Sequence, residues 1–428
     1  MGKTTLASFQ WMVFILAGTI VAPVSVAFAF GFTHAETADL LQRTFFVVGI
    51  TTLLQGLFGH KLPLTEGPAG LWWGVFLAYA ALAAQSGSPE KVLSGLEMGL
   101  LASGVLFILL SAFNMIRFVQ KLFTPAVIGT YLILLIIQLS GPFISGILGA
   151  DEGRVDGKTA LASLITLALS IFLSQSRMVF LKNYSVLISL IFGWVLFGVL
   201  GLTASQSSAQ LDIVTVPKWF VWGVPTFDAG IFITSLLTGL LLLTNMIASI
   251  EAVRQVVQPE KPESMRKTSF VMGINQMLAG VFPTVGGVPI SGSAGFILTT
   301  RIKERLPFLI GAAMILIMSF FPMITTFFAA LPAPVGYATL FVSMAGILGL
   351  GMNTVKQDLQ NVQKVQVISL SIMIGAGVLF IPETVLSSLP NVLRSLLHNG
   401  LVIGVLAAIL LDQMMARKTY RALSDECS

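Results

Sequence analysis

Two apolar segments of the chain are interrupted by proline and by clustered glycines, one in each half. They are Leu62-Pro-Leu-Thr-Glu-Gly-Pro-Ala-Gly-Leu-Trp-Trp73 and Val288-Pro-Ile-Ser-Gly-Ser-Ala-Gly-Phe296. Lipid cannot satisfy free backbone N–H and C=O groups, so non-helical backbone at bilayer depth occurs only where it lines a protein cavity. Matching breaks in two halves therefore predict a ligand site at the interface between two repeats.

Glu66 is the ionisable side chain of the first break. A carboxylate deep in a bilayer is costly unless it is protonated, paired or facing water, so it is a candidate for ligand binding and for carrying a proton. Gly70, in the same broken segment, is a second candidate for ligand contact. The alternative interpretation places Glu66 in a solvated cytoplasmic mouth close to Lys61.

The second break predicts extended backbone that turns into a short helix. The free N–H groups and the positive dipole end of that helix would point toward mid-membrane. Ser291, Gly292 and Ser293 are therefore candidates for binding an anion or a polar heterocycle with carbonyl oxygens. The alternative is that the glycines only permit close packing of helices.

A third polar feature lies within the apolar run 228–253. Asn245 and Ser249 are four residues apart, so they share one helix face. Asparagine has two donors and an acceptor, which suits the edge of a nucleobase, although both residue types also hold membrane helices together. Glu251 is expected to form an interfacial ion pair with Arg254. Other acids near span ends are interpreted in the same way: Glu97, Asp228 and Asp412.

Tryptophans next to the breaks are candidates for stacking on a flat ring. Trp11 opens the first apolar run, and Trp72 and Trp73 follow the first break. Trp219 and Trp222 are expected to be ordinary anchors at the membrane interface.

The composition identifies an integral membrane protein, because 55% of the 428 residues are hydrophobic and only 10% are charged. Apolar runs long enough to cross a bilayer recur throughout, and no soluble domain and no cleaved signal peptide are expected. We predict fourteen spans, at 9–30, 43–59, 62–84, 95–117, 123–147, 157–175, 183–203, 228–253, 266–284, 286–300, 307–330, 334–353, 364–387 and 397–414.

Basic residues support this count. In a topology with a cytoplasmic N-terminus, 18 of the 24 Lys and Arg residues fall in inward loops and six, including Arg43, in outward loops. The bias agrees with the positive-inside rule and accounts for the net charge of +5 without a nucleic-acid partner. Both termini are then cytoplasmic, with 416–428 as a tail.

Enzymatic chemistry is not expected. The single cysteine, Cys427, and three widely separated histidines provide neither a disulfide nor the ligand spacing of a metal site. The sequence also contains no nucleophile–base pair and no phosphate-binding loop. No cofactor is predicted, and a proton is the candidate coupling ion.

The fourteen spans divide into two halves of seven. Because seven is odd, a second copy would begin on the opposite side of the membrane, so the repeats would be inverted. Pro63-x-x-Glu66 and Pro289-x-x-Gly292 then occupy matching places in the third and tenth spans. We therefore predict an all-α polytopic membrane protein with short extended stretches in these two spans.

Several motifs together resemble one transporter family. They are Phe9-Gln10-Trp11, Thr19-Ile-Val-Ala-Pro23, Leu122-Phe-Thr-Pro125, the polar face at Asn245 and Ser249, Gly295-x-x-x-x-Thr300-Arg301, Glu66-Gly-Pro-Ala-Gly-Leu-Trp-Trp-Gly74 and Asn399-Gly-Leu-Val-Ile-Gly404. Over nearly the whole chain the sequence resembles the nucleobase–ascorbate transporters, also called nucleobase:cation symporter 2, and within them the purine permease branch.

The resemblance implies a fold of two inverted repeats of seven spans in one transporter domain, 1–428. A core subdomain would comprise about 1–120 and 226–331, and a gate subdomain about 121–225 and 332–415. Substrate would lie between the short strands of spans three and ten and the middle of span eight. Rocking of the core against the gate would give alternating access.

The chain departs from the family pattern where proton coupling is usually placed. Asn245 stands where glutamate is frequent, Ser249 where uracil permeases have histidine, and Gly292 where glutamate or glutamine is found. Ser293 replaces an asparagine, and Trp11 a histidine. The hypothesis is that Glu66, near the symmetry-related place in span three, supplies the missing carboxylate.

The expected function is secondary-active nucleobase transport across the cytoplasmic membrane, with a purine favoured over a pyrimidine. Three alternatives stay open: a uracil permease, an anion carrier of the sulfate or bicarbonate type, and a sensor that binds without transporting. The expected partners are a nucleobase and the lipid bilayer, with a homodimer as an open alternative.

Overall fold

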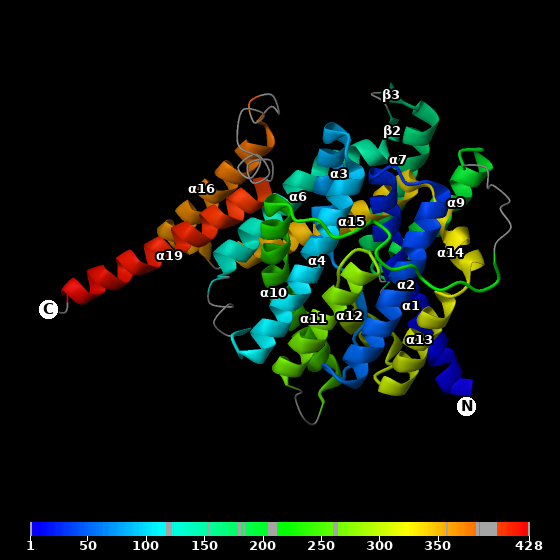
Figure 1. Cartoon of the computed structure of the whole chain (residues 1–428), viewed down its shortest axis with the longest axis horizontal. Helices are drawn as coiled ribbons and strands as arrows, with labels where there is room; N and C mark the ends of the chain where they lie inside the picture. Colours follow the sequence, from blue (N-terminus) through cyan, green and yellow to red (C-terminus); the bar gives the residue numbers. More distant parts are fainter. Residues whose placement is uncertain are drawn as a thin grey trace.

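A computed structural model describes most of the chain (Figure 1). The described residues are 2–116, 122, 124–151, 154–178, 181–182, 185–203, 212–259, 264–356, 358–381, 385 and 400–426. Predictions that concern residues 204–211, Arg117, Lys121, Lys261, Arg394, Asn399 and Cys427 lie outside the described residues.

The described chain is mostly helical, with a few very short strands. Its first half contains α1 (Gly2–Ala29), α2 (His34–Leu57), β1 (Glu66–Pro68), α3 (Gly70–Ser86), α4 (Pro89–Ala112), α6 (Pro125–Ile147), β2 (Ala150–Asp151), β3 (Arg154–Val155), α7 (Gly157–Ser174) and α9 (Ser185–Val199). Its second half contains α10 (Ala229–Val257), α11 (Met265–Val281), β4 (Gly287–Pro289), α12 (Gly292–Thr300), α13 (Arg305–Met318), α14 (Pro322–Ala329), α15 (Ala333–Lys356), η1 (Asp358–Gln360), α16 (Val362–Leu379) and α19 (Gly400–Glu426).

Each predicted span overlaps a helix, a strand followed by a helix, or the pair α13 and α14. Of the described helices, seven are long and apolar enough to cross a membrane alone, and an eighth span is obtained if α13 and α14, bent by 87° at their junction, count as one. Other helices are apolar but shorter, so the count of fourteen stays a prediction. The expected tail, 416–428, continues α19 as far as Glu426.

In two of the helices that begin earlier than predicted, the earlier start changes the place of a charged residue. Because α2 starts at His34, Arg43 lies inside the helix and is only 3% exposed, so its assignment to an outward loop is wrong. Because α4 starts at Pro89, Glu97 is fully buried, and neither carboxylate oxygen has a hydrogen-bond partner among the described residues. The expected interfacial ion pair of Glu97 is therefore not formed.

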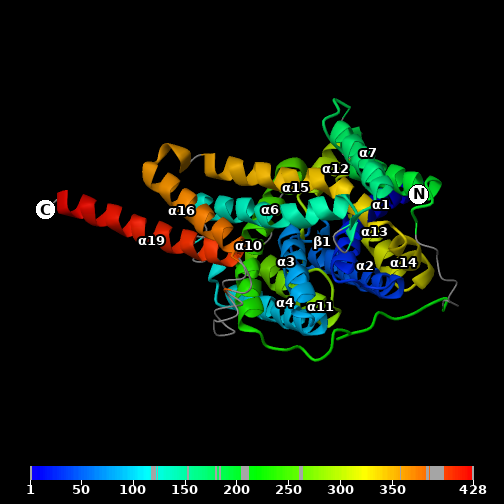
Figure 2. The ribbon, with the colours of Figure 1, turned by 90° about the horizontal axis from the view of Figure 1, so that it is seen from above.

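The helices form two layers that lie side by side in Figure 2. In one layer α4 packs against α10 and α11, and α13 packs against α1 and α2. In the other, α15 lies along α6 and α7, and α16 packs against α19 and α6. Contacts of α1 with α15 and of α3 with α6 join the two layers. The division of the chain into a core and a gate subdomain stays a prediction.

Small residues allow a close helix crossing between α4 and α11. A Cβ atom on Gly104 would lie 2.8 Å from the carbonyl oxygen of Gly273, and a Cβ on Gly273 would lie 2.8 Å from the carbonyl oxygen of Gly104. The two backbones therefore touch directly, as glycine permits in membrane proteins.

A buried ion pair joins α16 to α19. Lys364 Nζ lies 2.5 Å from Asp412 Oδ1, and Thr124 Oγ1 donates to Asp412 Oδ2 at 3.0 Å. The Asp412 side chain is only 2% exposed, so the expected ion pair of this acid is present, but between two helices in the protein interior.

Replacing Lys364 with methionine should destabilise this junction. After this change the buried Asp412 carboxylate keeps the hydroxyl of Thr124 as a donor but has lost its ion-pair partner. Removing one partner of a buried ion pair costs about 3 kcal/mol. Thermal unfolding in detergent should show a lower midpoint, and the double variant Lys364→Met/Asp412→Leu should recover most of the loss. An unchanged midpoint for Lys364→Met would show that the pair contributes nothing.

Candidate functional site

The two predicted breaks meet as a pair of short antiparallel strands. β1 and β4 pair with Glu66 opposite Pro289, Gly67 opposite Val288 and Pro68 opposite Gly287. Backbone hydrogen bonds extend the pairing on both sides, from Ala69 N to Gly286 O and from Ile290 N to Thr65 O, each at 2.8 Å. The strands thus satisfy each other's polar groups, and the expected meeting of the two breaks is present; that they enclose a ligand site stays a prediction.

Helices surround this strand pair in a defined order. α3 follows β1 and α12 follows β4, so two helix N-termini begin at the crossing, where their free N–H groups favour negative partial charge. α10 packs against β4, α3 and α12, while α1 and α2 cover β1. α10, the helix that carries Asn245 and Ser249, therefore packs against the strand pair.

Glu66 is buried at the start of β1, with 1% of its surface exposed. Asn275 Nδ2 of α11 donates to Glu66 Oε2 at 2.7 Å, and Glu66 N donates to Thr52 Oγ1 at 3.1 Å. Glu66 Oε1 is buried and has no hydrogen-bond partner among the described residues. The alternative of a solvated carboxylate beside Lys61 is therefore wrong.

α11 supplies contacts that sequence reasoning missed. Besides Asn275, the next residue, Gln276, bridges two elements, because its Nε2 donates to Gly287 O at 2.6 Å and its Oε1 accepts from Trp72 Nε1 at 2.7 Å. A Cβ on Gly287 would lie 2.9 Å from Asn275 Oδ1, so the strand touches this polar layer directly. Adjacent amides within an apolar helix were the signal that could have identified these residues.

The second break contributes both buried and exposed groups. Ser293 is fully buried and accepts from Thr65 N at 3.2 Å, with its hydroxyl 3.1 Å from that of Thr65. Ser293 therefore ties α12 to the residue before β1. Ser291 and Gly292 are exposed, so the backbone at the start of α12 is open to a ligand.

The predicted polar face of α10 is present. Ser249 is buried and its hydroxyl donates to Asn245 Oδ1 at 3.3 Å, while Asn245 itself is half-buried. Ser249 thereby orients the Asn245 amide and leaves the Nδ2 donors for another acceptor. Glu251 forms the expected ion pair with Arg254, at 4.0 Å. We call Glu66, Gly70, Asn245, Ser249 and residues 291–293 the central site.

Trp11 does not take the predicted role in this conformation. Its side chain is fully buried, with ring centroids 4.4 Å from Phe296 and 5.2 Å from Phe308. An indole enclosed by aromatic side chains has no face left for a ligand, so Trp11 packs α1 against α12 and α13. Trp72 is likewise fully buried.

Trp73 belongs to a contact between the two layers. Its Nε1 donates to Ser25 Oγ at 2.6 Å, and Tyr337 OH of α15 donates to Ser25 O at 3.2 Å. Phe143 of α6 completes the cluster, with its ring centroid 5.5 Å from that of Trp73 and 5.3 Å from that of Tyr337. This cluster closes the space between the layers beside the first turn of α3.

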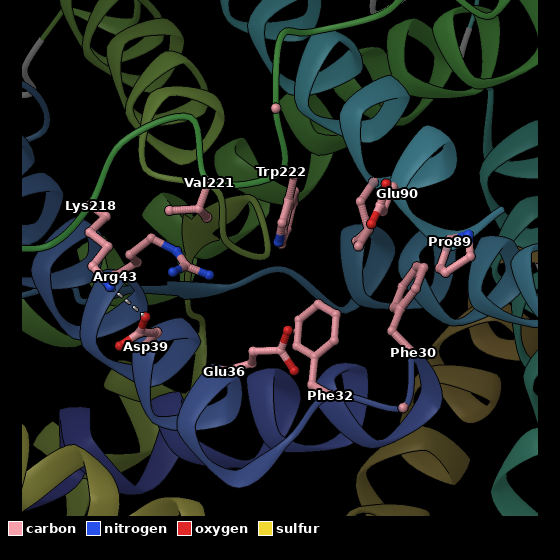
Figure 3. A pocket seen from close by; sticks show the side chains of 13 residues that line it. Phe30, Phe32, Glu36, Asp39, Arg43, Pro89, Glu90, Lys218, Val221 and Trp222 are labelled. Carbon is pink, nitrogen blue, oxygen red and sulfur yellow. Dashed lines mark hydrogen bonds and ion pairs between the residues drawn. The ribbon is translucent and has the colours of Figure 1, made fainter.

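A separate pocket of about 630 Å³ lies between the α1–α2 turn, the start of α4 and the segment 212–227 (Figure 3). We call it the outer pocket and the segment 212–227 the strap. The strap follows the helix ends at the lower edge of Figure 2, where Thr215 N donates to Phe320 O and Phe220 N to Val281 O, each at 2.9 Å.

Trp222 of the strap lines the pocket and is half-buried, whereas Trp219 is 69% exposed. Only Trp219 thus has the exposure expected of an interfacial anchor.

Comparison with known proteins gives consistent relatives. Residues 2–384 match the family model described as "Permease family". "Putative purine permease YwdJ" of Bacillus subtilis (strain 168) is 40% identical over 99% of both chains. The xanthine permease of the same organism is 25% identical, covering 96% of this chain and 93% of its own, and the uric acid permease PucJ is 25% identical, covering 99% and 94%.

Solved structures share the fold. The transmembrane domain of the cyanobacterial bicarbonate transporter BicA superposes with a TM-score of 0.63 at 15% identity, covering 95% of this chain and 96% of its own. Murine Slc26a9, an anion transporter in the inward-facing state, gives a TM-score of 0.64 at 10% identity, covering 97% and 68%. At such identities the likeness shows the architecture alone.

Proposed function

The chain belongs to the nucleobase–ascorbate transporter family of permeases, and we propose from this that it transports a purine by alternating access, with Glu66 carrying the coupling proton. The single observation that carries the proposal is the pairing of β1 with β4, against which α10 packs. That arrangement brings non-helical backbone, the Glu66 carboxylate and the helix that carries Asn245 to one part of the molecule.

The central site suits a planar ring with alternating donors and acceptors. Asn245 offers its Nδ2 donors because its Oδ1 already accepts from Ser249. The exposed backbone at Ser291 and Gly292 offers N–H groups at a helix N-terminus, which would bind a carbonyl oxygen of an oxopurine. The names of the relatives, a purine, a xanthine and a uric acid permease, support a purine over a pyrimidine.

The contact between the layers suggests how access alternates. Tyr337 of α15 bonds to Ser25 of α1, and Phe143 of α6 packs on Trp73 of α3. Separating these contacts would open one side of the central site, and a rocking motion of one layer against the other would close the opposite side.

Proton coupling is proposed for Glu66 because its two carboxylate oxygens differ in hydrogen bonding. Asn275 holds Oε2, whereas Oε1 is buried without a partner among the described residues and is free to hold a proton. Loss of that proton would place a charge beside the substrate, which couples the proton to substrate binding.

An anion carrier of the same architecture is the main alternative, since bicarbonate and other anion transporters share the fold. The charged side chain of the central site is a carboxylate, Glu66, which would repel an anion. Uptake of radiolabelled xanthine into proteoliposomes should be inhibited by unlabelled hypoxanthine, urate or xanthine, but not by sulfate or bicarbonate. Inhibition by uracil alone would indicate a uracil permease, and binding without uptake would indicate a sensor.

Replacing Asn245 with alanine should raise the KM for purine uptake about tenfold, because one hydrogen bond to a desolvated ring is worth about 1.4 kcal/mol. Thr244→Ala, one residue earlier on α10, should leave the KM unchanged and serves as the control. A normal KM for Asn245→Ala would remove this residue from the substrate site.

A further inference from the structure

The geometry of the outer pocket points to a second binding site, and we propose that it takes a planar heterocycle of the same class as the transported substrate. The inference rests on the proposed function for the identity of the ligand, but on separate residues for its binding. Its volume of about 630 Å³ is within the range of small-molecule sites.

A fixed guanidinium provides the first part of the site. Arg43 is only 3% exposed and lines the pocket, and its Nε donates to Pro283 O at 2.9 Å. Within the described residues, the Arg43 side chain makes this one hydrogen bond, through Nε. Both Nη groups are therefore available to donate to a ligand. Figure 3 shows the guanidinium directed into the pocket toward Trp222. A guanidinium held in this way presents two parallel donors to a carbonyl oxygen and a ring nitrogen.

Acceptors lie across from these donors. Glu36 lines the pocket, and its Oε2 accepts from Thr33 N and Thr33 Oγ1, each at 2.7 Å, in a capping box at the start of α2. The cap fixes the Glu36 carboxylate, which lies beside Phe32 in Figure 3. Fixed donors and fixed acceptors in one pocket favour a neutral ring with both C=O and N–H groups over a simple anion or cation.

Aromatic side chains supply the flat surfaces. Trp222 and Phe32 stand on opposite sides of the pocket in Figure 3, and both line it. Stacking on aromatic side chains is a general way for proteins to bind a planar base. At the rim, Lys218 pairs with Asp39 at 3.4 Å, and both side chains are well exposed, so this pair adds little.

Buried aromatic side chains separate the outer pocket from the central site. The Trp222 ring contacts Phe76 at 5.8 Å, and Phe76 contacts Trp72 at 6.4 Å. Phe76 and Trp72 are fully buried, and none of the residues of the central site lines the outer pocket. A ligand in the outer pocket would therefore be bound in addition to one in the central site.

Equilibrium dialysis of the purified full chain with labelled xanthine tests the proposal. Two molecules should bind per chain at saturation. Trp222→Ala should remove the outer site and leave one molecule per chain, whereas Asn245→Ala should weaken the binding of one of the two molecules about tenfold and leave the affinity of the other unchanged. The double variant should bind one molecule, with the weakened affinity. Arg43→Lys, which keeps the charge but loses the paired donors, should weaken the outer site at least fivefold. Trp222→Phe should keep the stoichiometry of two.

Trp219→Ala is the matched control, since Trp219 lies on the same strap, three residues away, and does not line the pocket. It should bind two molecules. If the unmodified chain binds one molecule and Trp222→Ala also binds one, the proposal of a second site is overturned. Binding that survives Asn245→Ala but is lost in Trp222→Ala would support the outer site even if xanthine were not transported. Failure of the proposed transport function can therefore be told apart from failure of the outer site.

Discussion

Glu66→Gln should make purine uptake insensitive to an imposed pH gradient and lower its initial rate about tenfold or more. Glutamine keeps the shape of the side chain and can still accept from Asn275, but it cannot ionise. The hydrogen bond that Asn275 makes to Glu66, at 2.7 Å, changes from neutral to charge-assisted whenever the carboxylate is ionised. Hydrogen bonds to charged groups contribute about 1.5–3 kcal/mol, which sets the scale of the effect.

The measurement is uptake of labelled xanthine into proteoliposomes with and without a pH gradient, acidic outside. Glu251→Gln is the control, because Glu251 is on α10 but its side chain is 57% exposed. Counterflow exchange at equal pH should persist in Glu66→Gln, since exchange needs no net proton movement. Gradient-driven accumulation at the normal level in Glu66→Gln would exclude this carboxylate from coupling.

Gly286→Ala should disrupt the strand pair and abolish transport. A Cβ at this position would lie 2.8 Å from Gln276 Oε1 and would overlap the Trp72 indole. The bond between Trp72 and Gln276 and the bond from Ala69 N to Gly286 O would both have to shift. Overpacking of this kind costs about 1–3 kcal/mol, so the thermal midpoint should fall as well.

Gly295→Ala is the matched control, because a Cβ on Gly295 would meet no atom within 4 Å. This variant should fold and transport normally. Uptake and the unfolding midpoint would be measured together for both variants. Normal transport by Gly286→Ala would mean that the strands tolerate displacement and that their pairing does not shape the substrate site.

Proline and glycine made the two breaks visible in the sequence, since an apolar run with such residues cannot remain a regular helix. The polar face at Asn245 and Ser249 was equally readable, because a spacing of four fixes which residues share a helix face. The hydrogen bond between these two side chains agrees with that interpretation. Helix starts were less accurate, because the polar first turns of α2 and α4 lack the apolar signal, and Arg43 and Glu97 were misplaced as a result.

By itself, the sequence determined the membrane class, the positions of the helical segments, the family and the candidates Glu66, Asn245 and Ser293, since all of these follow from local composition, spacing and motif. Only the tertiary structure decided that Asn275 bonds Glu66, 209 residues away along the chain, that Trp11 is enclosed, and that Arg43 and Trp222 face one pocket. The reason is physical. The partner of a buried polar group is set by which helices pack together, and local sequence patterns carry no information on which distant segments become neighbours.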